Sequence, residues 1–111
     1  MDLDIRETGA VCVLTVKGRL TSGEAVSLFE NAFQRALASG HICLVLDLEA
    51  VSFIDSSGIG SVVNALRQAN KVGGTVKLVN PSIPVAKTFK MVGILPLFNI
   101  HASEKEAIDA S

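Results

Sequence analysis

The sequence lacks tryptophan and tyrosine, and it contains only 5 phenylalanines among its 111 residues. The apolar share is nevertheless 49%, so a core has to be built from valine, leucine, isoleucine and alanine. Such a composition is typical of a buried sheet covered by helices. The length suits one compact domain, and we expect residues 1–111 to form it.

The chain also lacks an excess of charge and a long apolar run. Its formal net charge of -1 provides no electrostatic attraction to nucleic acid or to an anionic membrane. No apolar run approaches the roughly 20 residues that a membrane-spanning helix needs. The N-terminal segment MDLDIRETG is acidic and has no signal-peptide core. We therefore expect a cytoplasmic protein that binds neither nucleic acid nor membrane.

Cysteine is scarce, since Cys12 and Cys43 are the only two. Both lie in apolar runs and are expected to be reduced core residues. A disulfide remains possible if their strands are neighbours, but two thiols alone make a poor metal site. A phosphate-binding P-loop is absent, and Gly58-Ile59-Gly60 lacks the third glycine of a dinucleotide-binding loop. We expect no cofactor and no metal.

Hydrophobic periodicity predicts strands and helices in alternation after a first hairpin. Strands are expected at about 3–7, 11–17, 42–48, 75–79 and 97–100, and helices at about 24–39, 57–72, 82–92 and from 103 onward. Thr8-Gly9 is expected to turn the hairpin, and 18–22 to form a loop. Ser82 and Ser103 are suitable N-caps for the last two helices.

This order, β-β-α-β-α-β-α-β-α, predicts an α/β fold. We expect a mixed, mostly parallel sheet of about five strands with about four helices packed on it. The carboxyl ends of parallel strands lie at one edge of a sheet, where sites commonly form. Three loops are therefore expected to meet there, at 18–21, 55–58 and 80–82.

The stretch FIDSSGIG, residues 53–60, lies at the centre of that edge. Asp55 or Ser56 can cap the following helix, and the glycines allow close backbone packing. A helix start also tolerates a phosphate, so a serine there can carry one without unfolding its domain. The local residues leave both roles open. Along the helix, the spacing predicts that Ser61, Asn64 and Arg67 point away from the core.

Other chemistry of this stretch has weaker support. Neither serine lies in the G-x-S-x-G frame of serine hydrolases. His41 is expected at the opposite edge, which leaves His101 as the one conceivable base for a nucleophilic Ser56. The acidic cluster of a phospho-aspartate receiver is missing around Asp47 and Asp55. We expect a protein that is not an enzyme.

The segment LVLDLEAVSFIDSSGIGSVVNAL, followed by GGTVKLVN and VAKTFKMVGILPLF, resembles the STAS domain. More narrowly, it resembles the bacterial anti-sigma factor antagonists, over nearly the whole chain. The resemblance implies that Ser56, the first serine of D-S-S-G, is phosphorylated by a cognate anti-sigma factor that is an ATP-dependent serine kinase with a histidine-kinase-like fold. The unphosphorylated antagonist would bind that factor and free a sigma factor, and a phosphatase would reset the switch. Such a protein is the substrate of a kinase. We expect this chain to be a monomer or a weak dimer.

The resemblance also implies a partner-binding surface around the acceptor serine. Its expected members lie in the two central loops and on the exposed side of the following helix: Gly18, Arg19, Leu20, Thr21, Asp55, Ser56, Ser57, Gly58, Asn64 and Arg67. Family members often read G-E-L-D where this chain reads Gly18-Arg19-Leu20-Thr21. This departure keeps an alternative open, a constitutive STAS scaffold or adaptor in a stress-signalling or transport-associated complex, which works without phosphorylation.

Overall fold

The structure is a computed structural model that describes residues 1–41 and 43–110. A hairpin of β1 (Asp2–Thr8) and β2 (Val11–Leu20) is followed by α1 (Glu24–Ala38), β3 (Cys43–Ile54), α2 (Ser56–Lys71) and β4 (Thr75–Val79). The chain continues with α3 (Ile83–Met91), a 3-10 turn η1 (Leu95–Leu97), β5 (Asn99–His101) and α4 (Glu104–Asp109). The predicted order of elements is confirmed. The start of the third predicted strand, at Ile42, lies outside the described residues.

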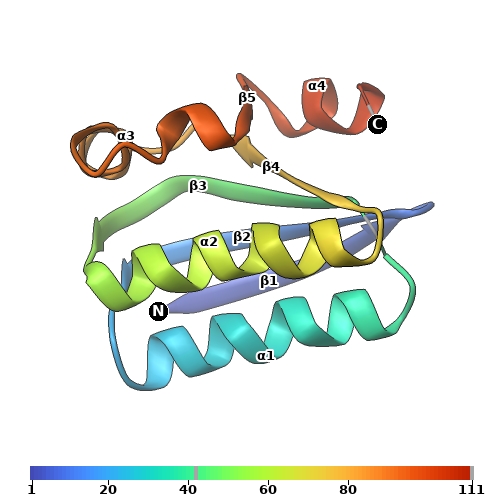
Figure 1. The fold of residues 1–111 in the computed structure, drawn as a ribbon, viewed down its shortest axis with the longest axis horizontal. Helices are drawn as coiled ribbons and strands as arrows, with labels where there is room; N and C mark the ends of the chain where they lie inside the picture. Colours follow the sequence, from blue (N-terminus) through green and yellow to red (C-terminus); the bar gives the residue numbers. More distant parts are fainter. Residues whose placement is uncertain (42, 111) are drawn as a thin grey trace.

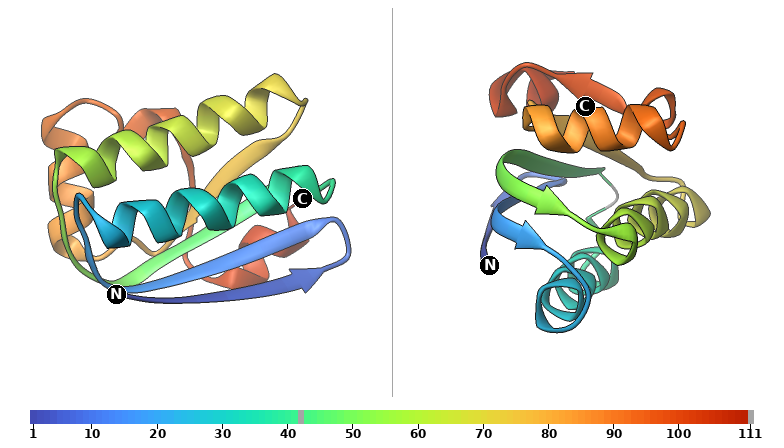
Figure 2. Two further views of the ribbon diagram at one scale, coloured as in Figure 1. Left: turned by 90° about the horizontal axis from the view of Figure 1, so that it is seen from below. Right: turned by 90° about the vertical axis from the view of Figure 1, so that its left-hand side faces the viewer.

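The strands form one sheet in the order β1-β2-β3-β4-β5. β1 is antiparallel to β2, and every later pair is parallel. Helices α1 and α2 lie side by side on one face of this sheet, as the views in Figures 1 and 2 show. The mixed, mostly parallel sheet of an α/β fold is therefore confirmed.

Alternate residues of the strands face two different cores. Leu14, Leu46 and Leu78 lie in the larger core together with buried side chains of α1, α2 and α3. Their neighbours at odd positions, such as Val13 and Val45, lie in a smaller core against α4. Successive side chains point to opposite faces of a strand, so the short α4 is what covers the second face.

The two cysteines are separated by the same alternation. Cys12 belongs to the larger core and Cys43 to the smaller one, although they lie on neighbouring strands. A disulfide requires side chains that point toward each other, and these point to opposite faces. Both cysteines are buried, and neither forms a disulfide among the described residues, which agrees with the expectation of reduced core residues.

β2 and β3 are longer than the sequence pattern predicted. The expected loop at 18–22 is wrong in its first half, because Gly18, Arg19 and Leu20 continue β2. The register between β2 and β3 shifts at two places, one of them between Gly18 and Arg19. Gly18 has a φ of 99°, which a residue with a side chain rarely adopts. These irregularities interrupt the alternation on which the prediction rested while the pairing itself continues.

The C-terminal third follows the prediction with small displacements. Ser82 caps α3 by accepting the Val85 N–H at 3.4 Å, and Ser103 caps α4 by accepting the Glu106 N–H at 3.1 Å. The last strand begins at Asn99 rather than at Leu97, which belongs to η1.

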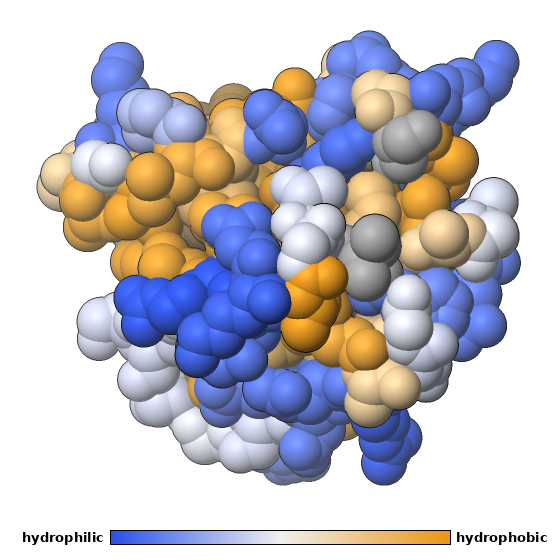
Figure 3. Space-filling model, turned by 45° about the vertical axis from the view of Figure 1, so that its right-hand side comes forward, coloured by the Kyte–Doolittle hydropathy of each residue, from blue (hydrophilic) through white to orange (hydrophobic). Residues whose placement is uncertain are grey.

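Figure 3 shows apolar atoms gathered at the upper left, where α3 and η1 lie. None of the helices in the described part of the chain is both long and apolar enough to cross a membrane.

Candidate functional site

Asp55 joins the two loops at the carboxyl ends of β2 and β3. It is the N-cap of α2, and its Oδ1 accepts the Gly58 N–H at 2.8 Å. Its other oxygen, Oδ2, accepts the backbone N–H of Ser22 at 2.9 Å. The N–H groups of Ser22 and Gly58 favour the charged form and hold the pKa of the Asp55 carboxyl below its usual value. The carboxylate therefore stays ionised and fixes the β2–α1 loop against the start of α2.

Gly58 is the point of closest approach between these loops. A Cβ at this position would lie 2.2 Å from the carbonyl oxygen of Leu20 and 2.7 Å from Cγ1 of Ile54. Gly60, two residues later, has no such neighbour within 4 Å. The expected role in close packing is thus observed for Gly58 and is absent at Gly60.

Ser56 and Ser57 occupy the first two positions of α2, and both are exposed. The Asp55 carboxylate takes the N–H of Gly58, and the Asp55 carbonyl oxygen accepts the N–H of Ile59 at 2.9 Å. A helix start carries N–H groups without intrahelical partners and a partial positive charge. The Ser56 hydroxyl therefore stands in solvent next to backbone that favours an anion.

Arg19 lies beside this site on β2. Its guanidinium carbon is 4.6 Å from the centroid of the Phe53 ring, which faces it from β3 in register. The Phe53 side chain is 44% exposed. A guanidinium over an aromatic face is attracted by the ring quadrupole, so the cation is held near the end of β3 and remains accessible. Sequence reasoning singled out Arg19 but overlooked its partner.

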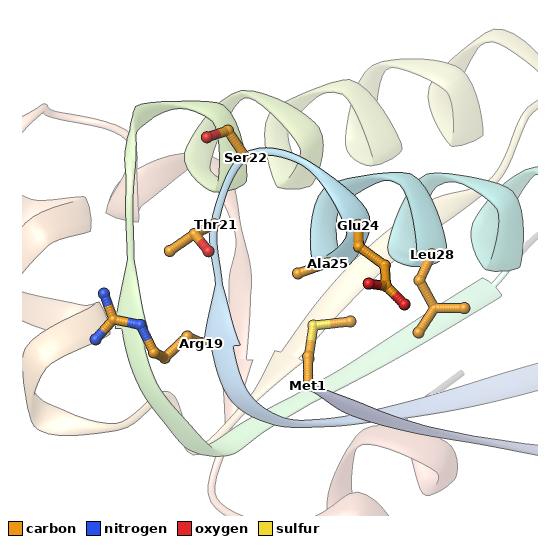
Figure 4. A pocket seen from close by; sticks show the side chains of 7 residues that line it. All are labelled: Met1, Arg19, Thr21, Ser22, Glu24, Ala25 and Leu28. Carbon is orange, nitrogen blue, oxygen red and sulfur yellow. The ribbon is translucent and has the colours of Figure 1, made fainter.

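A cavity of about 330 Å³ opens beside the β2–α1 loop and the first turns of α1. Its lining residues are Met1, Arg19, Thr21, Ser22, Glu24, Ala25 and Leu28. Figure 4 shows Met1, Ala25 and Leu28 gathered at one side, whereas the Arg19 side chain points away from them toward β3. The apolar side chains of the lining thus lie beside α1, whereas the cationic Arg19 side chain extends toward β3.

The remaining predicted residues are spread along α2 and β2. Arg67 is exposed, Asn64 is half-buried, and Leu20 is fully buried. The prediction that Ser61 points away is wrong, since its side chain is 3% exposed and its Oγ donates to the Gly58 carbonyl oxygen at 2.8 Å. A small hydroxyl that bonds back to its own helix can be buried, which a polarity pattern does not reveal.

The third expected loop lies further back along the sheet. The Ser82 hydroxyl donates to the Val51 carbonyl oxygen at 2.6 Å, and the Ser82 N–H donates to the Leu48 carbonyl oxygen at 3.3 Å. β3 continues past the end of β4, so Asp55 lies about four residues, or roughly 13 Å, beyond Val51 along the strand. Two of the three loops form the site, and the third supports the strand that leads to it.

Neither histidine forms a hydrogen bond with a serine at this site. His101 lies on β5, its Nδ1 is 3.3 Å from Glu106 Oε1, and its Nε2 has no hydrogen-bond partner among the described residues. His41 lies near Glu7 at the start of β3. The described residues also contain no group of three or more potential metal ligands. The serine–histidine pairing that nucleophilic catalysis requires is not formed with either ring.

Comparison with known proteins assigns the family. The model of the STAS domain matches residues 2–107. The chain belongs to the STAS family. It is 33% identical over 110 residues to an anti-sigma F factor antagonist of Lysinibacillus sphaericus, covering 98% of this chain and 90% of that protein. It is therefore an anti-sigma factor antagonist-like STAS domain.

Two solved structures of SpoIIAA carry the same fold. The anti-sigma factor antagonist SpoIIAA in its unphosphorylated form matches with a TM-score of 0.85 and 31% identity, over 98% of this chain and 95% of that one. The Bacillus cell fate determinant SpoIIAA in the phosphorylated form matches with a TM-score of 0.79 and 30% identity, over 98% of both chains. The STAS fold is thus compatible with both states of SpoIIAA.

Proposed function

We propose that this STAS domain binds a cognate anti-sigma factor when unphosphorylated, frees the sigma factor, and is switched off by phosphorylation of Ser56. The observation that carries this proposal is the exposed Ser56 at the first position of α2, beside a loop junction that Asp55 fixes. A kinase and a phosphatase both need such access. The surrounding backbone is held in one arrangement for a partner to recognise.

The start of α2 explains why a phosphate there would act without refolding the domain. A phosphoserine carries a charge of about -1.5 to -2 and three acceptor oxygens. The N–H groups and the dipole of the helix start favour that charge. In a complex, however, the same charge would lie within the contact surface, where an unpaired and desolvated dianion strongly opposes binding. The phosphate therefore changes affinity and leaves the fold unchanged.

The partner in this proposal is an anti-sigma factor that is also an ATP-dependent serine kinase with a histidine-kinase-like fold. A separate phosphatase removes the phosphate, and all three proteins act in the cytoplasm. The proposed contact surface joins the Gly18–Thr21 segment, residues 55–58 and the Asn64–Arg67 side of α2. Leu20 and Gly58 are buried, so they shape this surface through their backbone. The domain is a substrate and a switch, and it catalyses nothing itself.

Phosphorylation can be tested with the cognate kinase. The protein is incubated with that kinase and ATP, and the phosphate is mapped by mass spectrometry. We expect phosphate on Ser56, none in the Ser56→Ala variant, and normal labelling of Ser57→Ala, the matched control one position away. Labelling confined to Ser57, or no labelling at all, would contradict the proposal.

The switch itself is tested by binding. Ser56→Asp is expected to weaken binding to the same kinase by at least about tenfold, since each 1.4 kcal/mol of lost affinity corresponds to a factor of ten. Ser57→Asp places the same charge one residue further along α2 and is expected to have a smaller effect. Equal affinities of the wild type and Ser56→Asp would refute the switch.

A constitutive scaffold is the second candidate function, and Arg19 is the observation that favours it. Its guanidinium is held over Phe53 near the end of β3, where a cation could neutralise a phosphate on Ser56 and blunt the switch. This alternative expects a stable complex that Ser56→Asp does not disturb. Partner binding of the wild type and of Ser56→Asp discriminates the two functions, because only a switched antagonist loses affinity. Adding Arg19→Glu to Ser56→Asp then tests the role of the cation, since a scaffold that Arg19 protects is expected to lose affinity only in the double variant.

A further inference from the structure

The outer edge of β1 is open. β1 pairs with β2 along one side, and no strand in the described part of the chain pairs with the other side. Figure 2 shows β1 as the outermost strand, and all of its residues except Leu3 are exposed. An edge of this kind offers unpaired N–H and C=O groups to another strand. The chemistry of its side chains decides which strand fits.

The β1 sequence, DLDIRET, is complementary to itself in one antiparallel register. Two copies related by a twofold axis at Ile5 place Asp4 of each copy opposite Arg6 of the other. Directly opposed residues lie on the same face of a sheet, so this register forms two opposite-charge pairs. A twofold at Arg6 would oppose the two arginines, and a twofold at Asp4 would oppose two aspartates although it also places Asp2 opposite Arg6. Of these three registers, only the one at Ile5 has no like-charge pair. Within one chain Arg6 already pairs with Asp4 and Glu104, so the contact between copies would extend an existing ion-pair network.

The same register covers apolar surface on the α1 side. Ile5 is 46% exposed and Leu28 of α1 is 44% exposed. Both line a groove of about 200 Å³ between β1 and α1, together with Leu3, Ala32 and others. Pairing about Ile5 brings the Ile5 side chains of the two copies into contact at the mouth of this groove. Apolar burial and charge pairing thus favour the same arrangement.

We propose that two copies of this chain associate through their β1 edges and form one continuous sheet with five strands from each copy. The contact is limited to a seven-residue strand and the few apolar residues beside it, whereas stable protein–protein interfaces bury roughly 1,200–2,000 Å². The dimer is accordingly weak and depends on concentration. It does not involve Ser56, so the proposal stands or falls independently of the phosphorylation switch.

Charge reversal tests the register by sedimentation equilibrium. In Asp4→Arg, the new arginine faces Arg6 of the second copy, so both opposed pairs are basic, and in Arg6→Asp both opposed pairs are acidic. Each variant alone is expected to dimerise at least about tenfold more weakly than the wild type, because like charges directly opposite are destabilising. An equimolar mixture restores opposite charges in every pair and is expected to recover association as a heterodimer.

The result that recovery occurs only in the mixture also excludes misfolding as the cause of the loss. Ile5→Lys is expected to abolish association. Ile100→Lys on β5 is the matched control at the opposite edge, since Ile100 is 44% exposed and Ile5 is 46% exposed. Circular dichroism checks that both variants are folded. A wild type that stays monomeric at the highest accessible concentration, a mixture that does not recover, or a dimer that is lost in Ile100→Lys would each overturn the proposal.

Discussion

Replacing Gly58 by alanine is the sharpest test of how the site is assembled. The added Cβ would lie 2.2 Å from the Leu20 carbonyl oxygen, whereas a relaxed carbon–oxygen contact is about 3.3 Å. One of the two backbones must therefore move by about 1 Å. The obstructing atom belongs to the main chain of buried β2, so it cannot rotate away as a side chain would. The start of α2 has to separate from β2.

The size of the effect follows from two opposing contributions. Overpacking of this kind costs about 1–3 kcal/mol, and we expect the upper end because backbone meets backbone. Alanine in place of glycine within a helix returns about 1 kcal/mol. The net loss is about 2 kcal/mol in the free energy of unfolding, which lowers Tm by about 10 °C in a domain of this size.

Gly60→Ala is the matched control, two residues further along the same helix. No atom lies within 4 Å of its Cβ position, so only the helix-propensity gain of about 0.5–1 kcal/mol remains. Urea and thermal unfolding of the two variants therefore move in opposite directions. If Gly58→Ala and Gly60→Ala shift stability equally, the close approach at Leu20 does not exist and the assembly of the site is misunderstood.

Three further predictions concern carboxylates and thiols. Asp55→Ala is expected to lower Tm at neutral pH. Because the folded state lowers the pKa of Asp55, this loss of Tm is fully present above about pH 4 and disappears as the pH falls through the pKa of Asp55 in the folded state. Thermal unfolding at several pH values is the measurement. Burial and a hydrogen bond to Glu104 raise the pKa of Asp47 to about 6, so ionisation of Asp47 reduces the stability of the folded state as the pH rises from about 4 to 6. Asp47→Asn removes this contribution and is expected to be more stable than the wild type by about 1 kcal/mol at pH 8, after allowance for solvent screening, as urea titrations at pH 5 and 8 will show. Mild oxidation of the folded protein leaves Cys12 and Cys43 unlinked, and mass spectrometry that finds an intramolecular disulfide without unfolding would contradict their placement on opposite faces.

The sequence predicts most of the fold because its periodicities are clear. The strand at 75–79 and the helix beginning at Glu24 agree with the structure, since their patterns of buried residues are uninterrupted. The end of β3 could not be predicted, because Glu49 and Ser52 break the apolar run while the strand continues in pairing with β2. Non-local pairing maintained the strand where local pattern predicted its end.

The candidate site was predicted in part for similar reasons. Asp55 and Gly58 could be identified, because capping and close packing require those residue types near a helix start. The contact of the Ser22 N–H with Asp55 could not, since a backbone donor has no sequence signature. The pairing of Arg19 with Phe53 depends on the β2–β3 register, which the register shifts near Gly18 made inaccessible to pattern alone.

The candidate site lies at the end of a part of the sheet that only β2 and β3 form. β3 pairs with β4 only as far as Asp47 but with β2 as far as Ile54, so the last part of β2 and β3 is a two-stranded arm extending beyond the rest of the sheet. Ser82 ties this arm at Leu48 and Val51. Asp55 and Ser56 lie beyond this attachment along β3, so any rotation of the arm about it would move them further than Val51. Substitutions around Ser82 and in α3 are therefore expected to change the orientation of Asp55 and Ser56 while leaving both residues in place.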